Sequence, residues 1–245
     1  SWRFDIAIEA DLIEEVARLG GLDSIEERAT PMPLVPRAPA SREVDQRIVM
    51  RTLAARGYQE VITFAFVDPS LQQLLFGPQP AIELANPIAA DLSVMRSSLW
   101  PGLINAAREN LRRQQQRVRL FEIASRFSIA PGGVHLEQKM LSGIALGARL
   151  PEQWGSQSEP LDFYDVKGDV ESLLALAGPG QTGEAGDAAA APISFAPGGP
   201  GCLHPGRSAI IRRGEEVIGV IGELHPQLVR ALDLAHPPVL FELAY

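Results

Sequence analysis

Residues 118–129 read VRLFEIASRFSI and residues 139–148 read KMLSGIALGA, and these two stretches decide the fold class. The first alternates apolar and polar side chains in the manner of a strand. A Pro-Gly-Gly sequence at residues 131–133 favours a turn, so the second stretch is expected to return antiparallel to the first. A helix is predicted just before this hairpin, from about residue 101 toward residue 115.

The flanking segments add elements of both kinds. A helix is predicted to start at Ser41 and end at Gly57, because Val44, Ile48 and Leu53 recur at helical spacing. Further elements are expected as a strand at 58–68, a short helix near 68–76, a helix at 164–177, a hairpin that turns near Gly214, a short helix from Pro226 and a last strand. Strands outnumber what a helical bundle tolerates, so the predicted fold class is α+β, with an antiparallel sheet flanked by helices.

The composition predicts a globular chain that is acidic on balance. Its 245 residues carry a formal charge of -8 and are enough for one large domain or two small ones. Phosphate contacts need lysine and arginine, so this charge argues against nonspecific nucleic-acid binding along the whole surface. Cys202 is the single cysteine and no apolar run is long enough for a span or signal peptide, which makes the cytoplasm the default location. The chain begins without methionine inside a strand-like pattern, which suggests an excised fragment.

Proline and glycine mark two predicted interruptions. Residues 29–40, ATPMPLVPRAPA, contain four prolines and predict an extended linker. This linker would separate a small N-terminal segment, residues 1–28, from a large domain, residues 41–245. Residues 178–201 are rich in Gly, Ala and Pro and have few large apolar groups, so a mobile loop is predicted there.

Carboxylates gather where a predicted strand, residues 3–8, meets a helix that is expected to begin at Asp11. Acids in a first helical turn are stabilised by the positive end of the helix dipole, and Asp11 with Glu14 matches a capping box. Asp11, Glu14 and Glu15 also share one helical face that Asp5 can reach, and carboxylate oxygens are ligands that magnesium prefers. Spacing alone favours the cap over the metal by roughly two to one.

The basic run RRQQQRVR contains Arg112, Arg113, Arg117 and Arg119 at the end of the predicted long helix, where cations complement the negative helix end. A local phosphate contact and a salt-bridged partner surface are alternatives. No aromatic residues interleave to stack on bases, so RNA binding is weighed at roughly one in five. No histidine pair has metal-ligand spacing, and no glycine-rich phosphate loop or nucleophile elbow is present.

Five blocks of the sequence, taken in order, resemble the β subunit of bacterial phenylalanyl-tRNA synthetase. They are RFDIAIEADLIEEVARLGGLDSI (3–25), NPIAADLSVMRSSLWPGLINAARENLRRQQQRVRLFEIASRF (86–127), FYDVKGDVESLL (163–174), HPGRSA (204–209) and VIGVIGELHP (217–226). No single block is a catalytic signature, but together they cover nearly the whole chain. The resemblance implies the C-terminal end of the family's B5 domain in residues 1–28. It implies a catalytic-like domain with a class II synthetase fold in the remainder.

The resemblance also implies a metal. In this family the aspartate of the RFDI block and the acids of the DLIEE block are assigned to a magnesium ion shared with the α subunit. They correspond here to Asp5, Asp11, Glu14 and Glu15, so the resemblance reverses the balance and predicts a metal site. It further implies an (αβ)2 enzyme that joins phenylalanine to its tRNA using ATP, in which this region packs on the catalytic α subunit.

The same comparison shows departures from a catalytic class II core. Such a core needs an arginine in an aromatic-Arg-x-Glu strand, where this chain keeps Glu122 but has Leu120. It also needs a late Gly-x-Gly with a following arginine for the adenine end, where this chain has Gly219 and Gly222 at another spacing. Without those positive groups to stabilise developing negative charge, the domain is not expected to activate phenylalanine or to bind ATP itself. No catalytic or cofactor-binding residue is predicted.

Three functions therefore stay under consideration. The first is a noncatalytic assembly domain, in which the helix at 41–57 and the strand after it serve as the dimer-forming element of class II enzymes. The second is a stand-alone ligase-like enzyme with cryptic nucleotide binding, which an ATP titration would reveal. The third is a tRNA-binding module that uses the arginine run, which steeply salt-dependent tRNA binding would support.

Overall fold

A computed structural model describes residues 4–28, 44–177 and 191–245 of the chain. The chain divides into two compact units, residues 1–41 and 42–245. The predicted linker at 29–40 lies outside the described residues. The N-terminal unit contains helix α1 (Glu9–Gly20) and the 3₁₀ helix η1 (Leu22–Ser24). Within the described ranges, no helix combines the length and apolar character needed to cross a membrane.

Helix α1 begins two residues before the predicted start, because an acid in its first turn reaches back. The Asp11 Oδ2 atom accepts the backbone N–H groups of Ala7 at 2.7 Å and Ile8 at 2.9 Å, which turns the chain into the helix at Glu9. Residues 4–8 therefore form no strand, contrary to the prediction. None of the residues of α1 is buried, and its exposed apolar side chains are Leu12, Ile13, Val16 and Leu19.

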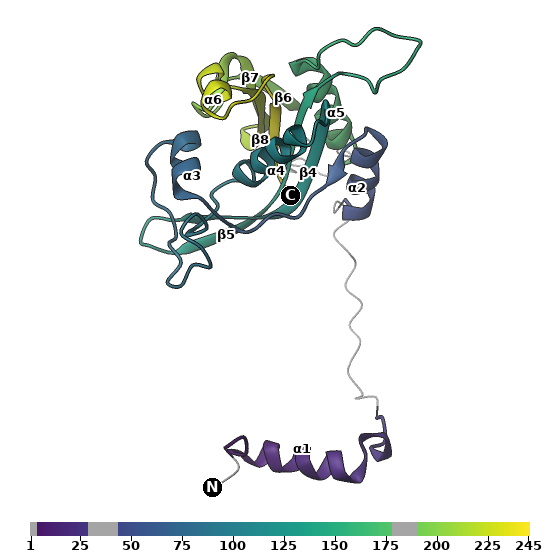
Figure 1. The fold of residues 1–245 in the computed structure, drawn as a ribbon, viewed down its shortest axis with the longest axis vertical. Coiled ribbons are helices and arrows are strands. Elements are labelled where there is room, and N and C mark those ends of the chain that lie inside the picture. The colour runs from purple at the N-terminus through teal and green to yellow at the C-terminus, as the bar shows by residue number, and fades with distance from the viewer. Residues whose placement is uncertain (1–3, 29–43, 178–190) are drawn as a thin grey trace. The chain divides into compact units, whose positions relative to one another are not determined.

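A seven-stranded sheet forms the centre of the C-terminal unit (Figure 1). Its strand order is β1-β4-β5-β9-β8-β7-β6, and neighbours are antiparallel except β1 and β4, which are parallel. The strands are β1 (Gln59–Glu60), β4 (Arg117–Ile129), β5 (His135–Gly147), β6 (Ile193–Pro197), β7 (Leu203–Arg213), β8 (Glu216–Leu224) and β9 (Val239–Ala244). A separate antiparallel pair consists of β2 (Phe66–Val67) and β3 (Val94–Met95). The predicted antiparallel architecture is confirmed.

The β4–β5 hairpin follows the two stretches on which the fold prediction rests. Residue 117 pairs with residue 147, and the register continues without a shift to residues 129 and 135. The turn contains Gly132 and Gly133, whose φ angles are 90° and 80°. Residues with a Cβ rarely adopt this backbone conformation. Because successive side chains of a strand point to opposite faces, this long hairpin supplies apolar groups to both sides of the sheet.

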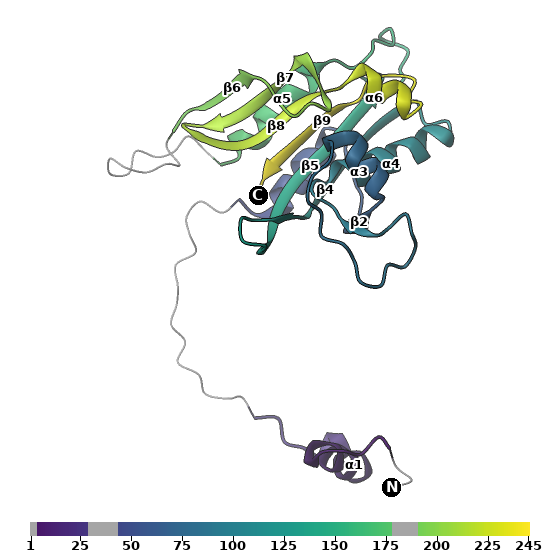
Figure 2. The same cartoon turned by 90° about the vertical axis from the view of Figure 1, so that its left-hand side faces the viewer.

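Helices cover both faces of the sheet, as Figure 2 shows. They are α2 (Gln46–Ala55), α3 (Pro69–Phe76), α4 (Trp100–Arg112), α5 (Phe163–Ala175) and α6 (Pro226–Ala231). Helices α3, α4 and α6 share one apolar cluster with Leu120 and Ile144, and we call this side the α4 face. Helices α2 and α5 share a second cluster with Phe121 and Ala145, and we call that side the α5 face. The burial of apolar area in these two clusters is the main favourable contribution to folding.

Two predicted elements differ from the structure. Residues 58–68 do not form one strand but only β1 and β2, because the backbone N–H of Thr63 donates to the Glu122 carboxylate rather than to a neighbouring strand. In the predicted loop at 178–201, residues 178–190 lie outside the described part of the chain. Its remainder includes β6, an edge strand that pairs with β7, so the loop prediction is wrong there. Phe195 of β6 packs against the cluster of the α5 face.

Candidate functional site

Leu120 lies on the α4 face of β4. It occupies the position at which a catalytic class II core would have its phosphate-binding arginine. Its side chain is only 3% exposed and belongs to the same apolar cluster as Trp100 and Leu103 of α4. A charged group at this depth would lose its hydration without a partner, which is costly. The position therefore serves the core and offers no cation to a ligand.

Glu122 is also on the α4 face, and all of its described contacts are internal. Its Oε1 atom accepts from Arg96 Nη1 and from the backbone N–H of Thr63, both at 3.1 Å, and its Oε2 atom accepts from the Thr63 hydroxyl at 2.8 Å. Arg96 in turn donates from Nε to the Ser125 carbonyl at 2.9 Å. Both charged side chains are 4% exposed. Glu122 therefore holds the segments that contain Thr63 and Arg96 against β4, and both of its carboxylate oxygens already accept hydrogen bonds.

Gly219 and Gly222, where a late glycine motif was considered, both lie inside β8. A Cβ on Gly219 would stand 2.6 Å from the Glu242 carbonyl oxygen and 2.5 Å from Leu243 Cδ2. Glycine is needed there because β9 approaches closely. A glycine inside a paired strand cannot form a phosphate-binding loop, so no adenine-binding motif is found at this place.

Glu242 of β9 is the other buried acid on the α4 face. Its Oε1 atom accepts from the Ser98 hydroxyl and the Leu99 N–H, both at 2.9 Å, and Arg126 Nη1 lies 3.4 Å from its Oε2 atom. Burial raises the pKa of Glu242 above the ordinary value, and these donors oppose the shift. A small cavity of about 270 Å³ lies here, between Arg126, Glu242 and Val220. A buried carboxyl group disfavours binding of an anionic nucleotide in this cavity.

The predicted metal ligand Asp11 is half-buried and takes part in the start of α1. The hydrogen bonds from the Ala7 and Ile8 N–H groups lower the pKa of Asp11. A slight loss of hydration and the charge of Asp5 act in the opposite direction. The repulsion between Asp5 and Asp11 is one that a bound cation would relieve.

The other two predicted ligands lie one turn further along α1. Glu14 is exposed, and the Glu15 Oε2 atom pairs with Arg18 Nη2 at 2.8 Å. Among all residues that the structure describes, no three or more His, Cys, Asp or Glu side chains are arranged to hold a metal ion. The four carboxylates are therefore near in sequence but do not form a ready-made site within this chain.

The arginines of the basic run do not form one cationic patch. Arg113 is engaged in an exposed i, i+4 ion pair, whereas Arg119 is buried with its Nη1 atom 2.9 Å from Asp169 Oδ2. Arg112 lines an open pocket, and Arg117 lies half-buried at the start of β4. Because a nucleic-acid backbone is bound through several accessible cations, this dispersal argues against the run as an RNA site.

The open edge of the sheet, residues 59–64, carries exposed apolar side chains, and we call it the β1 edge. Ile62 is 92% exposed and Phe64 is 61% exposed, although both follow directly on β1. Phe64 stacks on Phe66 with ring centroids 5.2 Å apart. On the neighbouring helix α2, Val49 and Leu53 are buried whereas Ile48 is 48% exposed. Large apolar groups exposed along the open edge of a sheet are typical of a surface that another chain covers.

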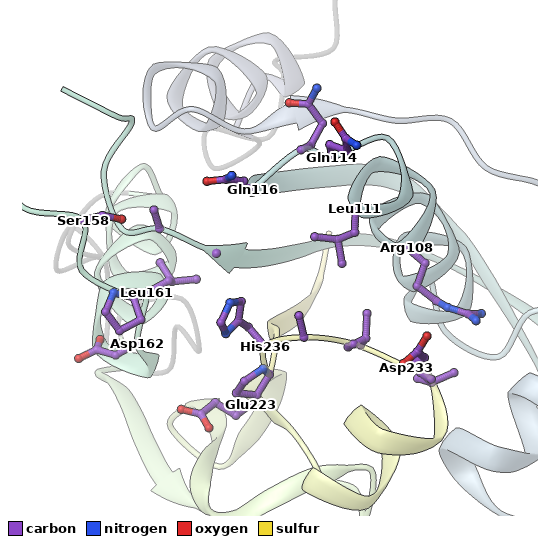
Figure 3. Close-up of a pocket in the computed structure, with 18 of the residues that line it drawn as sticks. Arg108, Leu111, Gln114, Gln116, Ser158, Leu161, Asp162, Glu223, Asp233 and His236 are labelled. Carbon is purple, nitrogen blue, oxygen red and sulfur yellow. The ribbon is translucent and has the colours of Figure 1, made fainter.

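A broad pocket of about 1150 Å³ opens beyond the C-terminal end of α4. In Figure 3, Arg108 and Asp233 lie on one side of it, and Ser158, Leu161 and Asp162 lie on the other. The pocket is thus built from segments that are far apart in the sequence. No periodic pattern or motif links these segments, so the sequence offers no signal for it.

The charges around this pocket nearly cancel. They come from Arg108, Arg112, Arg207, Glu159, Asp162, Glu223 and Asp233. Arg207 is already paired with Glu223 at 2.9 Å. Helices α4 and α6 both end at the pocket, where Gln114 and Asp233 adopt positive φ, and helix C-terminal ends disfavour anions. The arrangement does not select a phosphate or a nucleotide.

Comparison with known proteins identifies relatives along nearly the whole chain. A family model described as the phenylalanyl tRNA synthetase beta chain CLM domain matches residues 25–245. The phenylalanine–tRNA ligase beta subunit of Pseudomonas fluorescens Pf-5 is 46% identical over 243 residues, and that of Methylococcus capsulatus is 45% identical over 248 residues. Each match covers 99% of this chain but only 29% of the relative.

Among solved structures, the pyrrolysyl-tRNA synthetase of Desulfitobacterium hafniense is similar in fold. It matches 96% of this chain and 71% of its own with a TM-score of 0.58 and 17% sequence identity. At this identity the likeness concerns the fold alone. It confirms the predicted class II synthetase architecture.

Proposed function

This chain belongs to the family of the phenylalanyl-tRNA synthetase beta chain CLM domain, and on that premise we propose that it is a noncatalytic assembly region of a phenylalanine–tRNA ligase β subunit. The whole enzyme joins phenylalanine to its tRNA with ATP in the cytoplasm, as an (αβ)2 assembly. This region packs on the catalytic α subunit and contributes carboxylates to a magnesium ion shared between the subunits. It does not bind ATP itself.

The observation that carries the assembly role is the apolar β1 edge. Its exposed side chains, Ile62 and Phe64, alternate with Val61 and Thr63, which face inward and bind β4. Single exposed apolar side chains are common on protein surfaces, but apolar groups gathered along an open sheet edge are a feature of interaction surfaces. Ile48 of α2 is also exposed, as expected if this helix and the β1 edge together form the dimer-type element of the fold.

The absence of catalysis is supported by the α4 face. Leu120 is buried where a phosphate-binding arginine would be needed, and Glu122 is occupied by Arg96 and Thr63. Phosphoryl chemistry depends on positive groups placed at the developing charge, whereas the arginines described on this face, Arg96 and Arg126, are paired with Glu122 and Glu242. The fold is thus suited to be kept for assembly after the chemistry has been lost.

The assembly role is tested by Ile62→Asp in the full-length β subunit, co-expressed with its α subunit. A charge at a buried apolar contact should weaken α–β association by about 30-fold or more, as measured by sedimentation. The melting temperature of the free β subunit should stay the same, because residue 62 is exposed. Val134→Asp, in the exposed β4–β5 turn, is the matched control. Normal assembly of the Ile62 variant would overturn the proposal.

The magnesium site is supported by charge rather than by a finished geometry. Asp5, Asp11, Glu14 and Glu15 crowd four carboxylates into eleven residues, and no set of three within this chain, in its described part, converges on one point. The ion therefore needs further ligands from a partner, which explains why it would be shared. The α subunit is the proposed source.

Bound magnesium is measured in the purified full-length enzyme to test this site. The test variant combines Asp11→Ala, Glu14→Ala and Glu15→Ala, and the control combines Asp23→Ala, Glu26→Ala and Glu27→Ala. Both remove one aspartate and two glutamates from the same unit. The test variant should lose magnesium and weaken assembly, whereas the control should keep both. Unchanged metal content in the test variant would contradict the magnesium site and leave these acids only the role of stabilising the start of α1.

A further inference from the structure

Arg117, the first residue of β4, is a half-buried arginine that lies against Gly57. A Cβ on Gly57 would stand 3.1 Å from Arg117 Nη2 and 3.2 Å from Nη1, so the guanidinium lies tightly against Gly57. Gly57 also has φ of 81°, which favours glycine independently. Among the described residues, none accepts a hydrogen bond from the Arg117 side chain, and its Nε atom is buried without a partner.

The neighbouring charges leave Arg117 uncompensated. Asp169 is the acid of this cluster, and its Oδ1 atom pairs with Arg56 at 2.7 Å. Its Oδ2 atom accepts from Arg119 at 2.9 Å and from the Tyr58 hydroxyl at 3.0 Å. Burial first, and the charge of Arg119 second, lower the pKa of Arg117. Three arginines thus share one carboxylate that is already bound on both oxygens, and Arg117 is the one of the three that makes no ion pair with it. The Nε atom of Arg119 is also buried without a hydrogen-bond partner.

Arg96 shows how the same domain treats an arginine that serves the fold. Its guanidinium is fully enclosed and donates to Glu122, Thr63 and the Ser125 carbonyl. Burying a guanidinium nitrogen without an acceptor has a cost, so such groups are usually met by a protein group, an ordered water or a ligand. Arg117 therefore carries a donor set that the domain itself leaves unused.

We propose that Arg117 binds a carboxylate side chain of the α subunit, in two parallel N–H···O bonds, where that subunit covers the β1 edge. This inference rests on the proposed assembly role. Arg117 lies beside Gly57, two residues before β1 begins. A partner that covers Ile62 on this edge of the sheet can therefore also reach Arg117. The planar fork of a guanidinium matches a carboxylate in shape and charge.

A protein carboxylate fits this place better than an RNA phosphate. Phosphate backbones are bound by several accessible cations, but Arg119 is buried with Asp169 and Arg113 is paired within α4. The exposed apolar group at Ile62 indicates a partner with an apolar surface beside its acid.

The test uses the full-length β subunit with its α subunit and the variants Arg117→Gln and Arg117→Lys. Arg113→Gln is the matched control, because it removes the same charge from an exposed pair in the adjoining helix. Arg117→Gln should weaken association by about tenfold or more at low salt, and Arg117→Lys should weaken it less. The free β subunit carrying Arg117→Gln should melt at the same temperature as the wild type or higher, since an unpartnered buried charge has been removed.

Each other outcome overturns the inference. A lower melting temperature of the free variant with normal assembly would make Arg117 a structural residue. If Arg117→Gln and Arg113→Gln weaken α–β association equally, the effect comes from the net charge of the surface and not from a specific contact of Arg117. Weaker tRNA binding by the assembled enzyme with unchanged assembly would show that the anion is a phosphate. If Ile62→Asp weakens assembly and Arg117→Gln does not, only this inference fails, whereas normal assembly of Ile62→Asp removes the assembly role itself.

Discussion

The α4 face of the sheet and the region of the β1 edge both contain arginine and large apolar side chains. These groups are paired or buried on the α4 face but unpaired or exposed at the edge. On the α4 face, Arg96 and Glu122 bind each other and Leu120 fills the core. At the β1 edge, Arg117 has no described acceptor and Ile62 lies in water. The interior thus uses its polar and apolar groups to hold the fold, whereas the edge leaves its groups available.

This difference supports the proposed assembly role at the β1 edge. A catalytic face needs polar groups that are held in place but still free to meet a ligand. The α4 face has Glu122 and Glu242, yet both accept hydrogen bonds from within the chain. The unused binding capacity lies instead at an edge with apolar character, which suits recognition of another protein chain.

The largest expected effect comes from restoring an arginine on the α4 face. Leu120→Arg places a charge among buried apolar side chains, and the loss of unfolding free energy should exceed about 4 kcal/mol. Chemical denaturation measures it, with Leu120→Met as a volume-conserving control that should cost less than about 1.5 kcal/mol. A folded Leu120→Arg protein that binds ATP would show that this face still forms a nucleotide site.

The second prediction removes the partner of Arg96. Glu122→Ala leaves a buried guanidinium uncompensated, and about 3–5 kcal/mol of unfolding free energy should be lost. Glu109→Ala breaks the exposed pair with Arg113 and should cost at most about 0.5 kcal/mol. Similar costs in both variants would contradict the division between a structural interior and an available surface.

A third, smaller effect concerns Glu242 and pH. Because burial raises its pKa, the folded state keeps a proton over a range in which the unfolded state has lost it. The unfolding free energy of the wild type relative to Glu242→Gln should fall as pH rises above the ordinary glutamate value of 4.5, and should level off above the folded pKa. The slope should not exceed about 1.4 kcal/mol per pH unit. A relative stability that rises with pH would show that the donors outweigh burial.

The smallest effect is expected at Asp11 in the exposed N-terminal unit. The N–H groups of Ala7 and Ile8 lower its pKa, so its contribution is present above the ordinary value of 3.8 and is lost as pH falls through the folded pKa. Asp11→Asn should therefore increase fraying at the start of α1 at neutral pH, seen as faster amide exchange at Ala7 and Ile8. Equal exchange in both proteins would rule out the proposed helix start.

Much of the fold was predictable from short patterns. The β4–β5 hairpin, the helix before it and the hairpin at Gly214 all follow from alternation, helical spacing and turn residues. The start of α1 was missed because Asp11 acts backward onto Ile8 rather than forward as a cap. Part of the loop predicted at 178–201 is the edge strand β6, whose pairing depends on β7 and not on its own composition.

The candidate sites were predictable to a lesser extent. The resemblance indicated Leu120 as the missing arginine, and its burial agrees with that interpretation. The acids from Asp5 to Glu15 stay a prediction, since they do not converge within the described chain. No local signal pointed to Arg117 as an unpartnered cation, because its state depends on Gly57, Arg119 and Asp169 together.

The sequence by itself determined the strands and turns of the central hairpin, the acidic balance of the chain and the leucine at position 120. These properties depend on residue type or on neighbours within a few positions. Only the tertiary structure decided that Glu122 is bound by Thr63, 59 residues away, while Ile62 beside it faces water. Alternation shows that the two faces of a strand differ. Packing between distant segments decides which face is covered and which side chain keeps an unused hydrogen-bond donor.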